Sequence, residues 1–330
     1  MRLRFENIDL KSTSGPNHFG KKLYNQLIKN KSVFFDGTPD ISLCFIESHR
    51  PDPFDIPVVQ RLDGIYFNTK QNSAFQNLNI QRTYDEASGV VLQSYFDKQL
   101  VFKYFGEHKN YKVIHNGADI EYIDQIQPLK NKSLDKFENV WSCASSWRPH
   151  KRLRDNISYF LEHSGEKDCL VVAGDYSEED PISNDRIFFT GNLDVQNLTA
   201  LYKRSKYFIH LAWLDHCPNV VVDAQGSGCQ IICSSAGGTR EVAGSDAIVI
   251  EEEEWDFQPV DLYSPPKLDF SKKIENNWNM VINMEEVAKR YYYFLNKTMH
   301  IELDTSEKLK SSVKKNLLPP VQTSNIELEK

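Results

Sequence analysis

Four short segments in the second half of the chain combine residue types that bind anions or polyhydroxyl ligands. The first, SSWRPHKRLR, crowds cations around the expected start of a helix near residue 150, namely Arg148, Lys151, Arg152 and Arg154. Cations have the wrong sign for this position, because the macrodipole and the free N–H groups of a helix N-terminus favour negative charge. A bound anion removes the conflict, and Lys151 is the first contact that we expect. The structural alternative is that these long side chains point into water.

The second segment, LAWLDHCPNVVVDAQGSG, places a loop directly before another expected helix. Pro218 suits the first helical position, so residues 215–217 precede a helix N-terminus whose N–H groups can hold a phosphate or sugar hydroxyls. Asn219 and Asp223 are four positions apart and share a helix face. A carboxylate on that face can accept two hydrogen bonds from a ribose diol. Helix capping is the alternative for Asp215, whereas a charged Asp223 among apolar neighbours is harder to explain structurally.

The other two segments, FFTGNLD (188–194) and SSAGGTREVAG (234–244), are loops of small residues that follow apolar runs. Small residues let a ligand approach the backbone closely, and we expect Asn192 or Leu193 to meet the edge of a nucleobase. An ordinary turn is the alternative for the first loop. The second leads into a short helix near Thr239. Glu241 in that helix has two equally good interpretations, a residue of the ligand site or an ordinary acid in the first helical turn.

Alternating strands and helices must position these segments. Between residues 140 and 250, apolar runs such as VWSCA, CLVVAG and YFIHLA alternate with helical patterns, which predicts βαβ units and a parallel sheet covered on both faces. In such sheets, ligands bind beyond the carboxyl ends of the strands. The first third repeats this style with the runs ISLCFIES, PVVQRL, GVVLQS and YKVIHNG. We therefore predict an α/β protein with two doubly wound Rossmann-like domains that face a central cleft.

The domain limits follow from changes in composition. We predict a first domain over residues 1–137, with a polar linker at 120–139, and a second domain over 138–283. EEVAKRYYYFL predicts a helix over about 284–300. The Ser/Lys/Glu-rich stretch 301–330 is expected to be a disordered tail without a function.

Composition excludes several classes of protein. The net charge of −7 argues against a nucleic-acid partner, and no apolar run approaches the roughly 20 residues of a membrane span. The start, MRLRFENIDLKS, lacks the apolar region of a secretory signal. The six cysteines form no C-x-x-C pair and predict buried thiols in a reducing, cytoplasmic setting. Membrane association is not evident and stays open.

Taken together, the segments resemble the retaining GT-B glycosyltransferases of family four, the glycosyl transferases group 1. That family carries E-G-F-P-x-x-x-x-E-A followed by G-x-P-V-I and G-G-x-x-E. The corresponding stretches here are DHCPNVVVDA (215–224), GCQII (228–232) and GGTRE (237–241). The stretches VIHNGAD (113–119), VVLQSYFDK (90–98) and RPHKRL (148–153) are similar to further elements of the family.

The resemblance implies that residues 1–137 form the acceptor side, that residues 138–283 bind the nucleotide-sugar, and that the helix over about 284–300 rejoins the first domain. It also implies a role for each matching position. Asp223 stands where the family binds the ribose, Asp215 where it faces the donor sugar, and Lys151 where it binds the diphosphate. The catalytic residues expected are Asp63, Arg148, Lys151 and Asp215. The donor-binding residues expected are Gly15, Arg152, Thr190, Gly191, Asn192, Leu193, His216, Cys217, Pro218, Asn219, Asp223, Gly237, Gly238 and Thr239.

Four positions depart from the family pattern. Both family glutamates are aspartates here and are one methylene shorter, and Ser146 replaces an arginine for which Arg148 or Arg152 can compensate. Asp63 stands where the family usually has a histidine near the reacting sugar. Residues 14–17 (SGPN) occupy the place of a glycine-rich loop.

The expected chemistry is transfer of a hexose-type sugar from a nucleoside diphosphate donor, which is a substrate and not a cofactor, to a glycan, lipid or protein acceptor. No Asp-x-Asp metal motif is visible, so we expect metal independence and no metal-binding residues. Retention is implied by the resemblance, and it fits a front-face mechanism in which the leaving phosphate deprotonates the acceptor hydroxyl. The alternatives are a catalytically degenerate nucleotide-sugar-binding protein and a GT-B epimerase or phosphorylase. A dehydrogenase is disfavoured, since no strand is followed by G-x-G-x-x-G.

Overall fold

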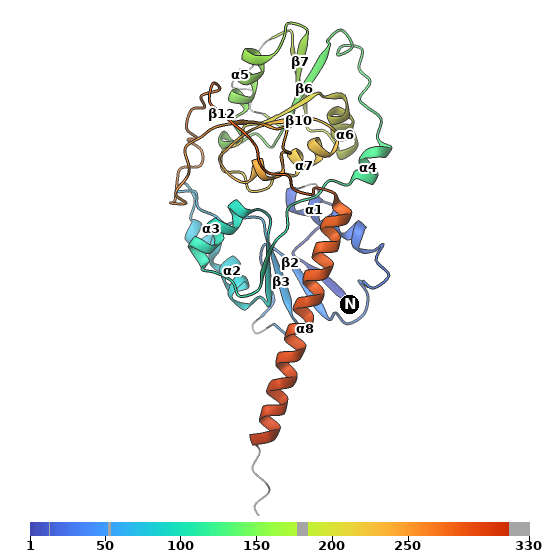
Figure 1. Ribbon diagram of the computed structural model, residues 1–330, viewed down its shortest axis with the longest axis vertical. Helices are drawn as coiled ribbons and strands as arrows, with labels where there is room; N and C mark the ends of the chain where they lie inside the picture. The colour runs from blue at the N-terminus through green and yellow to red at the C-terminus, as the bar shows by residue number, and fades with distance from the viewer. Residues whose placement is uncertain (13, 52–53, 177–183, 317–330) are drawn as a thin grey trace, which may run out of the picture.

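The computed structural model describes residues 1–12, 14–51, 54–176 and 184–316, and it contains two α/β domains stacked end to end (Figure 1). All strands of the first sheet precede residue 137, and all strands of the second follow residue 138. The two-domain α/β architecture with parallel sheets is therefore as predicted.

The first sheet is parallel and has the order β1-β2-β3-β4-β5. A parallel bridge between Arg2 and Phe34 adds one more piece of extended chain on the outer side of β1. The chain therefore leaves β1 in one direction and returns to β2 on the other side, so β1 is the point where the strand order reverses. The strands are β1 (Leu3–Glu6), β2 (Ile41–Phe45), β3 (Val58–Leu62), β4 (Gly89–Leu92) and β5 (Tyr111–Val113).

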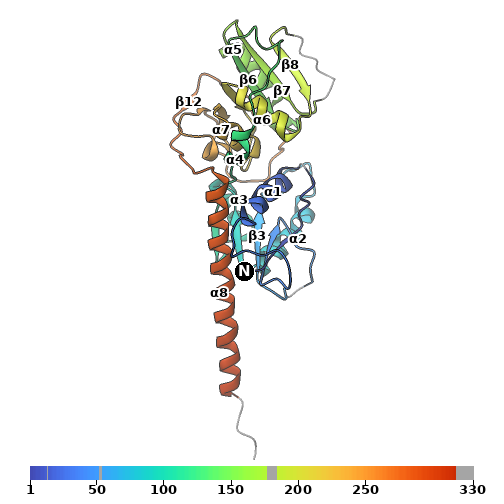
Figure 2. The same ribbon diagram turned by 90° about the vertical axis from the view of Figure 1, so that its right-hand side faces the viewer.

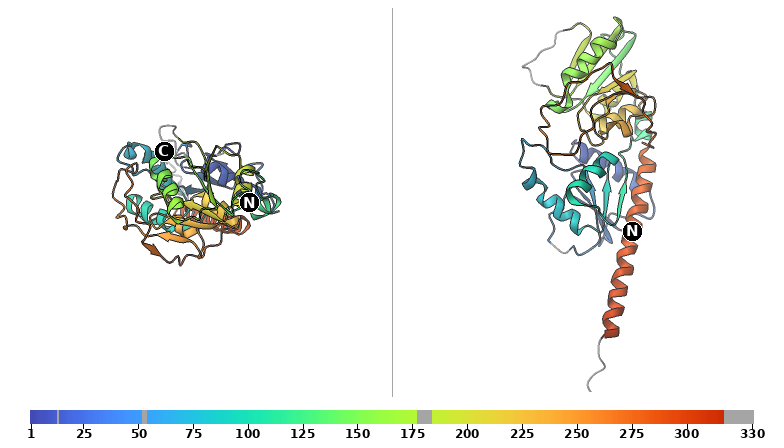
Figure 3. Two further views of the ribbon diagram at one scale, coloured as in Figure 1. Left: turned by 90° about the horizontal axis from the view of Figure 1, so that it is seen from above. Right: turned by 60° about the vertical axis from the view of Figure 1, so that its left-hand side comes forward.

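Helices cover both faces of this sheet, as a doubly wound domain requires. On one face α1 and α8 pack together with Leu43 and Val59 of the sheet, and on the other face α2 and α3 pack on Leu62 and Val90. Figure 3 shows the sheet between α8 and the helices of the opposite face. The helices are α1 (Gly15–Leu27), α2 (Ser73–Glu86), α3 (Tyr95–Phe105) and α8 (Met284–Asn316).

The second sheet has the order β12-β11-β10-β9-β6-β7-β8, in which only β12 is antiparallel. Its strand order reverses between β6 and β9, since β7 and β8 extend the sheet in one direction and β10 and β11 in the other. Ligands of open α/β sheets bind at such a reversal. The strands are β6 (Asn139–Ala144), β7 (Asp168–Ala173), β8 (Ile187–Gly191), β9 (Tyr207–His210), β10 (Gln230–Ser234), β11 (Ile248–Ile250) and β12 (Lys273–Ile274).

Buried apolar side chains explain why these strands form. All six residues of β7 are buried, and β9 and β10 are buried except at their first residues, as expected for parallel strands covered on both faces. One face packs on α6 and α7, and the other on α5. The helical elements of this domain and of the preceding linker are α4 (Ile120–Gln125), η1 (Pro149–Lys151), α5 (Leu153–His163), α6 (Val195–Arg204), α7 (Asn219–Gly226) and η2 (Thr239–Val242).

The last helix, α8, returns to the first domain and runs along it (Figure 2). Its residues Met284, Val287, Tyr291 and Leu295 are buried in the core that contains α1. We expected this helix to end near residue 300 and to be followed by a disordered tail, but it continues to Asn316. The sequence explains the difference, because no glycine or proline interrupts it before Pro319. Residues 317–330 lie outside the described residues.

Candidate active site

A cleft of about 980 Å³ lies between the two domains and contains most of the predicted site residues. Its walls come from the loops after β1 and β3 in the first domain and after β6, β7, β8 and β9 in the second. Both points of strand reversal therefore open into the same space. The predicted residues that line it are Gly15, Asp63, Arg148, Lys151, Asn192, Leu193, Asp215, His216, Cys217, Pro218, Asn219 and Asp223.

Two cations enter the cleft from the loop after β6. The side chain of Arg148 is exposed in it and forms no ion pair or hydrogen bond with the described residues. Lys151 ends the short helix η1, and its Nζ lies 2.5 Å from Oδ2 of Asp215. We expected an α-helix to begin near His150, but a 3-10 turn comes first and α5 starts at Leu153. The unpaired guanidinium of Arg148 is therefore the cation most available to an anionic ligand.

The carboxylate of Asp215 has three hydrogen-bonding partners, Lys151, His210 and the backbone of His216. Besides Lys151, Nε2 of His210 lies 2.8 Å from Oδ2, and the backbone N–H of His216 donates to Oδ1 at 3.0 Å. Burial acts to raise the pKa of Asp215, but the charge of Lys151 and the hydrogen bond from His210 hold it well below its usual value. Burial also lowers the pKa of His210. The carboxylate therefore stays ionised and is a weak base.

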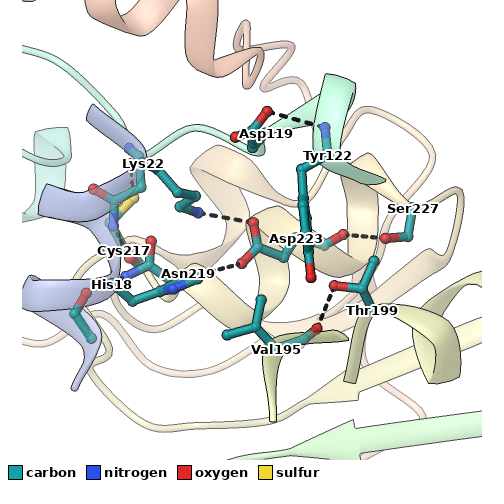
Figure 4. A network of polar contacts seen from close by, with 12 residues as sticks. His18, Lys22, Asp119, Tyr122, Val195, Thr199, Cys217, Asn219, Asp223 and Ser227 are labelled. Atoms are coloured by element: carbon teal, nitrogen blue, oxygen red, sulfur yellow. Dashed lines mark hydrogen bonds and ion pairs between the residues drawn. The ribbon is translucent and has the colours of Figure 1, made fainter. Parts of the chain in front are cut away.

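Asp223 projects from α7 and meets the first domain across the cleft (Figure 4). Nζ of Lys22 lies 2.9 Å from its Oδ1, and Nε2 of His18 lies 3.4 Å from its Oδ2. Burial acts to raise the pKa of Asp223, and the charge of Lys22 together with the contact with His18 lowers it overall. Asp223, which lacked a structural explanation in the sequence, is half-buried and has partners on α1 that the sequence did not reveal.

Asp63 follows β3 and faces the cleft from the first domain. It pairs with the buried guanidinium of Arg61, whose Nη2 donates to Oδ1 of Asn116 at 2.7 Å and whose Nε donates to the hydroxyl of Tyr291 at 3.1 Å. The side chain of Phe19 lies under the guanidinium, 4.0 Å from ring centre to Cζ. This scaffold fixes a carboxylate opposite the second-domain cations.

The second loop of small residues supports the site from outside the cleft. The N–H of Gly238 donates to the carbonyl of Asp215 at 2.7 Å, and a Cβ at Gly238 would lie 2.0 Å from the carbonyl oxygen of His216. Gly237 bridges to Asp215 with a φ of 93°, and Thr239 is fully buried. None of these three residues lines the cleft; they brace the loop at 215–216, and their direct contact with the donor stays a prediction.

The expectation that Arg152 binds the donor is wrong. Its side chain is buried and pairs with Glu252 at 2.8 and 2.7 Å, and it donates to the carbonyls of Leu211 and Pro266. A residue at this helix start can be cationic without an anionic ligand, because its counter-charge comes from a segment 100 positions away. Arg152 is therefore a structural residue and does not belong to the anion site.

The first loop of small residues, for which we predicted contact with a nucleobase, lies only partly in the cleft. Asn192 and Leu193 line the cleft, whereas Thr190 and Gly191 do not. The Thr190 hydroxyl donates to the carbonyl of Val172 at 3.3 Å, and Gly191 has a φ of 66°. These two residues thus end β8 and turn the chain toward the cleft without lining it.

Glu241 makes an inter-domain contact that sequence reasoning missed. Its carboxylate accepts the backbone N–H groups of Tyr95 at 2.7 Å and Phe96 at 2.8 Å, which belong to the first turn of α3, and it lies 2.7 Å from Nε2 of His115. It is an acid in a first helical turn, as we considered, but it caps a helix of the other domain.

The described part of the chain has neither a cluster of metal-ligating side chains nor a membrane-spanning helix. No three histidine, cysteine, aspartate or glutamate side chains gather there in a way that can hold a metal ion. Within the same residues, no helix is both long and apolar enough to cross a bilayer.

Comparison with known proteins agrees with this geometry. Residues 140–258 match the family model described as "Glycosyl transferases group 1". An uncharacterized glycosyltransferase of Methanocaldococcus jannaschii, MJ1069, is 27% identical over 210 residues, which are 59% of this chain and 51% of the relative. The match thus spans about half the length of that curated relative.

Solved structures of similar fold cover nearly the whole chain. Anabaena HepE in complex with UDP-glucose superposes with a TM-score of 0.55 at 14% identity, over 92% of this chain and 100% of that one. AviGT4, a glycosyltransferase involved in avilamycin A biosynthesis, has a TM-score of 0.57 at 12% identity, over 91% and 98% of the two chains. At these identities the likeness establishes the fold alone.

Proposed function

We propose that this chain, a GT-B protein of the glycosyl transferases group 1, transfers a hexose-type sugar from a nucleoside diphosphate donor to an acceptor hydroxyl with retention of configuration. The observation that carries the proposal is the cleft between the domains, in which Arg148 and Lys151 lie with Asp215 and Asp223 at the strand reversal of the second sheet. The similarity to HepE, which was solved with UDP-glucose, supports a donor of this kind.

The site can stabilise the departing diphosphate. Cleavage of the anomeric C–O bond places negative charge on the phosphate, and cations and N–H groups already fixed around it lower the barrier without reorganisation. Arg148 and Lys151 supply the cations, and the first turn of α7 supplies N–H groups. On this proposal the leaving group needs no metal ion.

The remaining groups fit a front-face mechanism. Because Asp215 is held in its ionised form, it is suited to stabilise positive charge on the sugar and is too weak a base to deprotonate the acceptor. The leaving phosphate then takes the acceptor proton, and Asp63 orients the acceptor hydroxyl from the first domain. No residue is required to form a covalent intermediate.

One observation favours a second candidate function, a catalytically degenerate donor-binding protein. Lys151 is committed to Asp215 at 2.5 Å, and both acids are shorter than the family's glutamates. Such a protein binds nucleotide-sugars without turnover.

The test is incubation with UDP-, GDP- and ADP-hexoses, with and without glycoside, lipid-linked and peptide acceptors, in the presence and absence of EDTA. We expect an acceptor-dependent product whose anomeric configuration matches the donor by NMR, unchanged by EDTA. Binding without transfer or hydrolysis supports the degenerate protein, and an epimerised donor or a sugar phosphate formed from inorganic phosphate indicates the epimerase or phosphorylase. Loss of activity in EDTA, restored by a divalent cation, refutes metal independence.

All six cysteines are free and buried, which supports our expectation of a reducing compartment such as the cytoplasm. The donor base, the sugar and the acceptor are to be identified by the same panel.

A further inference from the structure

The contact between Asp223 and the side chains of Lys22 and His18 on α1 offers both hydrogen-bond donors and acceptors to a ligand. Lys22 is buried, with 7% of its side chain exposed, whereas the Asp223 side chain keeps 18% of its surface and lines the cleft. A purely structural ion pair does not need an opening to a cleft, and burying an ammonium group is costly unless its N–H groups are satisfied.

Hydrogen-bonding capacity remains at this cluster after the protein contacts are made. A carboxylate offers about four lone pairs and an ammonium group three N–H donors. Lys22 and His18 use one lone pair on each oxygen of Asp223, and Lys22 uses one donor in that contact. Acceptors on Asp223 and donors on Lys22 are therefore left side by side.

Two further polar groups border the same part of the cleft. The hydroxyl of Tyr202, whose residue is 1% exposed, has no hydrogen-bond partner among the described residues, and its side chain lines the cleft. The charge of Asp223 reaches it, because burial and that charge both raise the pKa of Tyr202 well above its usual value. Oδ1 of Asn219, one helical turn before Asp223, is also buried and without a partner in the described part of the chain. Buried polar groups usually have a hydrogen-bond partner, and because Tyr202 and Asn219 line the cleft, a ligand bound there can supply one.

We propose that Lys22 and His18 complete a ribose site with Asp223 and Tyr202, so that the ribose of the donor is recognised by both domains at once. Each hydroxyl of a vicinal diol donates one hydrogen and accepts others. Asp223 accepts the hydrogens, and Lys22 and Tyr202 donate to the oxygens. This inference rests on the proposed function, and it adds that the first domain takes part in binding the nucleoside.

The site predicts discrimination against a donor that lacks the 2′-hydroxyl. Removing that hydroxyl leaves buried lone pairs and N–H groups without partners, which costs more than the loss of one exposed hydrogen bond. We expect the wild-type protein to bind a ribonucleoside diphosphate about tenfold or more tightly than its 2′-deoxy counterpart.

The experiment is isothermal titration of the full chain with UDP, GDP and ADP, and then with the 2′-deoxy form of the nucleotide that binds most tightly. Lys22→Met and His18→Gln are compared with Lys21→Met, which removes the same charge from the exposed neighbour of Lys22 on α1. We expect Lys22→Met to weaken ribonucleotide binding about tenfold and to abolish the preference for the 2′-hydroxyl, whereas Lys21→Met retains both.

The outcomes separate the two proposals. If the wild-type protein binds a nucleotide but does not discriminate against the 2′-deoxy form, or if Lys22→Met discriminates as well as Lys21→Met does, the shared ribose site is refuted and the proposed function stands. If no nucleotide binds, the proposed function fails and this inference fails with it. Should Lys22→Met not fold, as judged by circular dichroism, the wild-type comparison and His18→Gln decide the question.

Discussion

The contact between Glu241 and the first domain makes the sharpest prediction about stability. Three donors converge on this carboxylate, the N–H groups of Tyr95 and Phe96 and Nε2 of His115, and Glu241 is only 3% exposed. Glu241→Gln keeps the shape of the side chain but replaces one accepting oxygen with an NH2 group. That group faces donors, so at least one of them loses its acceptor.

The cost has two parts. A buried donor without a partner costs about 1–3 kcal/mol, and loss of a negative charge at the N-terminus of α3 costs about 0.3–2 kcal/mol. Together they give about 1–5 kcal/mol. At about 2.1 cal/mol/K of unfolding entropy per residue over 330 residues, this lowers the melting temperature by about 2–7 °C.

Scanning calorimetry of Glu241→Gln beside Glu254→Gln measures the effect. Glu254 is an exposed acid of the same domain, so its change removes an equal charge without breaking a buried contact. We also expect Glu241→Gln to weaken binding of the donor, because the cap joins the two walls of the cleft. If Glu241→Gln melts within 1 °C of the Glu254→Gln protein, the carboxylate does not cap α3 and the reasoning is wrong.

Three other predictions concern the second domain. Lys151→Met is expected to lower kcat/KM by about 10²–10³, as measured in the transfer assay, since it removes a cation from the departing phosphate; a fall below threefold contradicts that role. Burial lowers the pKa of His150 from 6.5 to about 4, so the folded state resists its protonation, and stability is highest above pH 6.5 and falls as the pH drops toward 4. The loss is about 3 kcal/mol, and urea unfolding of His150→Gln at several pH values is expected to show a flatter profile over that range. Gly238→Ala places a methyl group 2.0 Å from the carbonyl oxygen of His216, so we expect lower thermal stability and lower activity together; normal activity argues that Gly238 does not brace the loop at 215–216.

The fold was most predictable where burial was most complete. β6, β7, β9 and β10 are runs of apolar residues in the sequence. β1 (LRFE) and α2 (SAFQNLNIQRTYDE) were not predicted. Only one residue of β1 is buried, and α2 buries only four of its residues, so neither carries a strong hydrophobic period.

The sequence predicted the site residues that follow strand ends, but it did not predict their long-range partners. Residues that follow strand ends, such as Lys151 and Asp215, gather because parallel strands share an edge. The partner of Asp223 could not be predicted from the sequence, since Lys22 is 201 positions away. The same holds for Arg152, whose partner Glu252 is 100 positions away. A cation at a helix start is ambiguous for this reason, because an anionic ligand and a distant carboxylate satisfy it equally well.

The charges in the cleft also bear on the order of events in the proposed reaction. Asp215 is neutralised by Lys151, and Asp223 by Lys22, so Arg148 is the one cation among these groups that has no counter-charge in the described chain. A diphosphate carries more negative charge than one guanidinium balances, and we therefore expect Lys151 to turn toward it when the donor binds. Asp215 then keeps its hydrogen bonds from His210 and the His216 N–H but loses its neutralising cation. In that state its negative charge is uncompensated until the anomeric carbon becomes positive, so the same movement that stabilises the leaving phosphate also prepares Asp215 to stabilise the sugar cation.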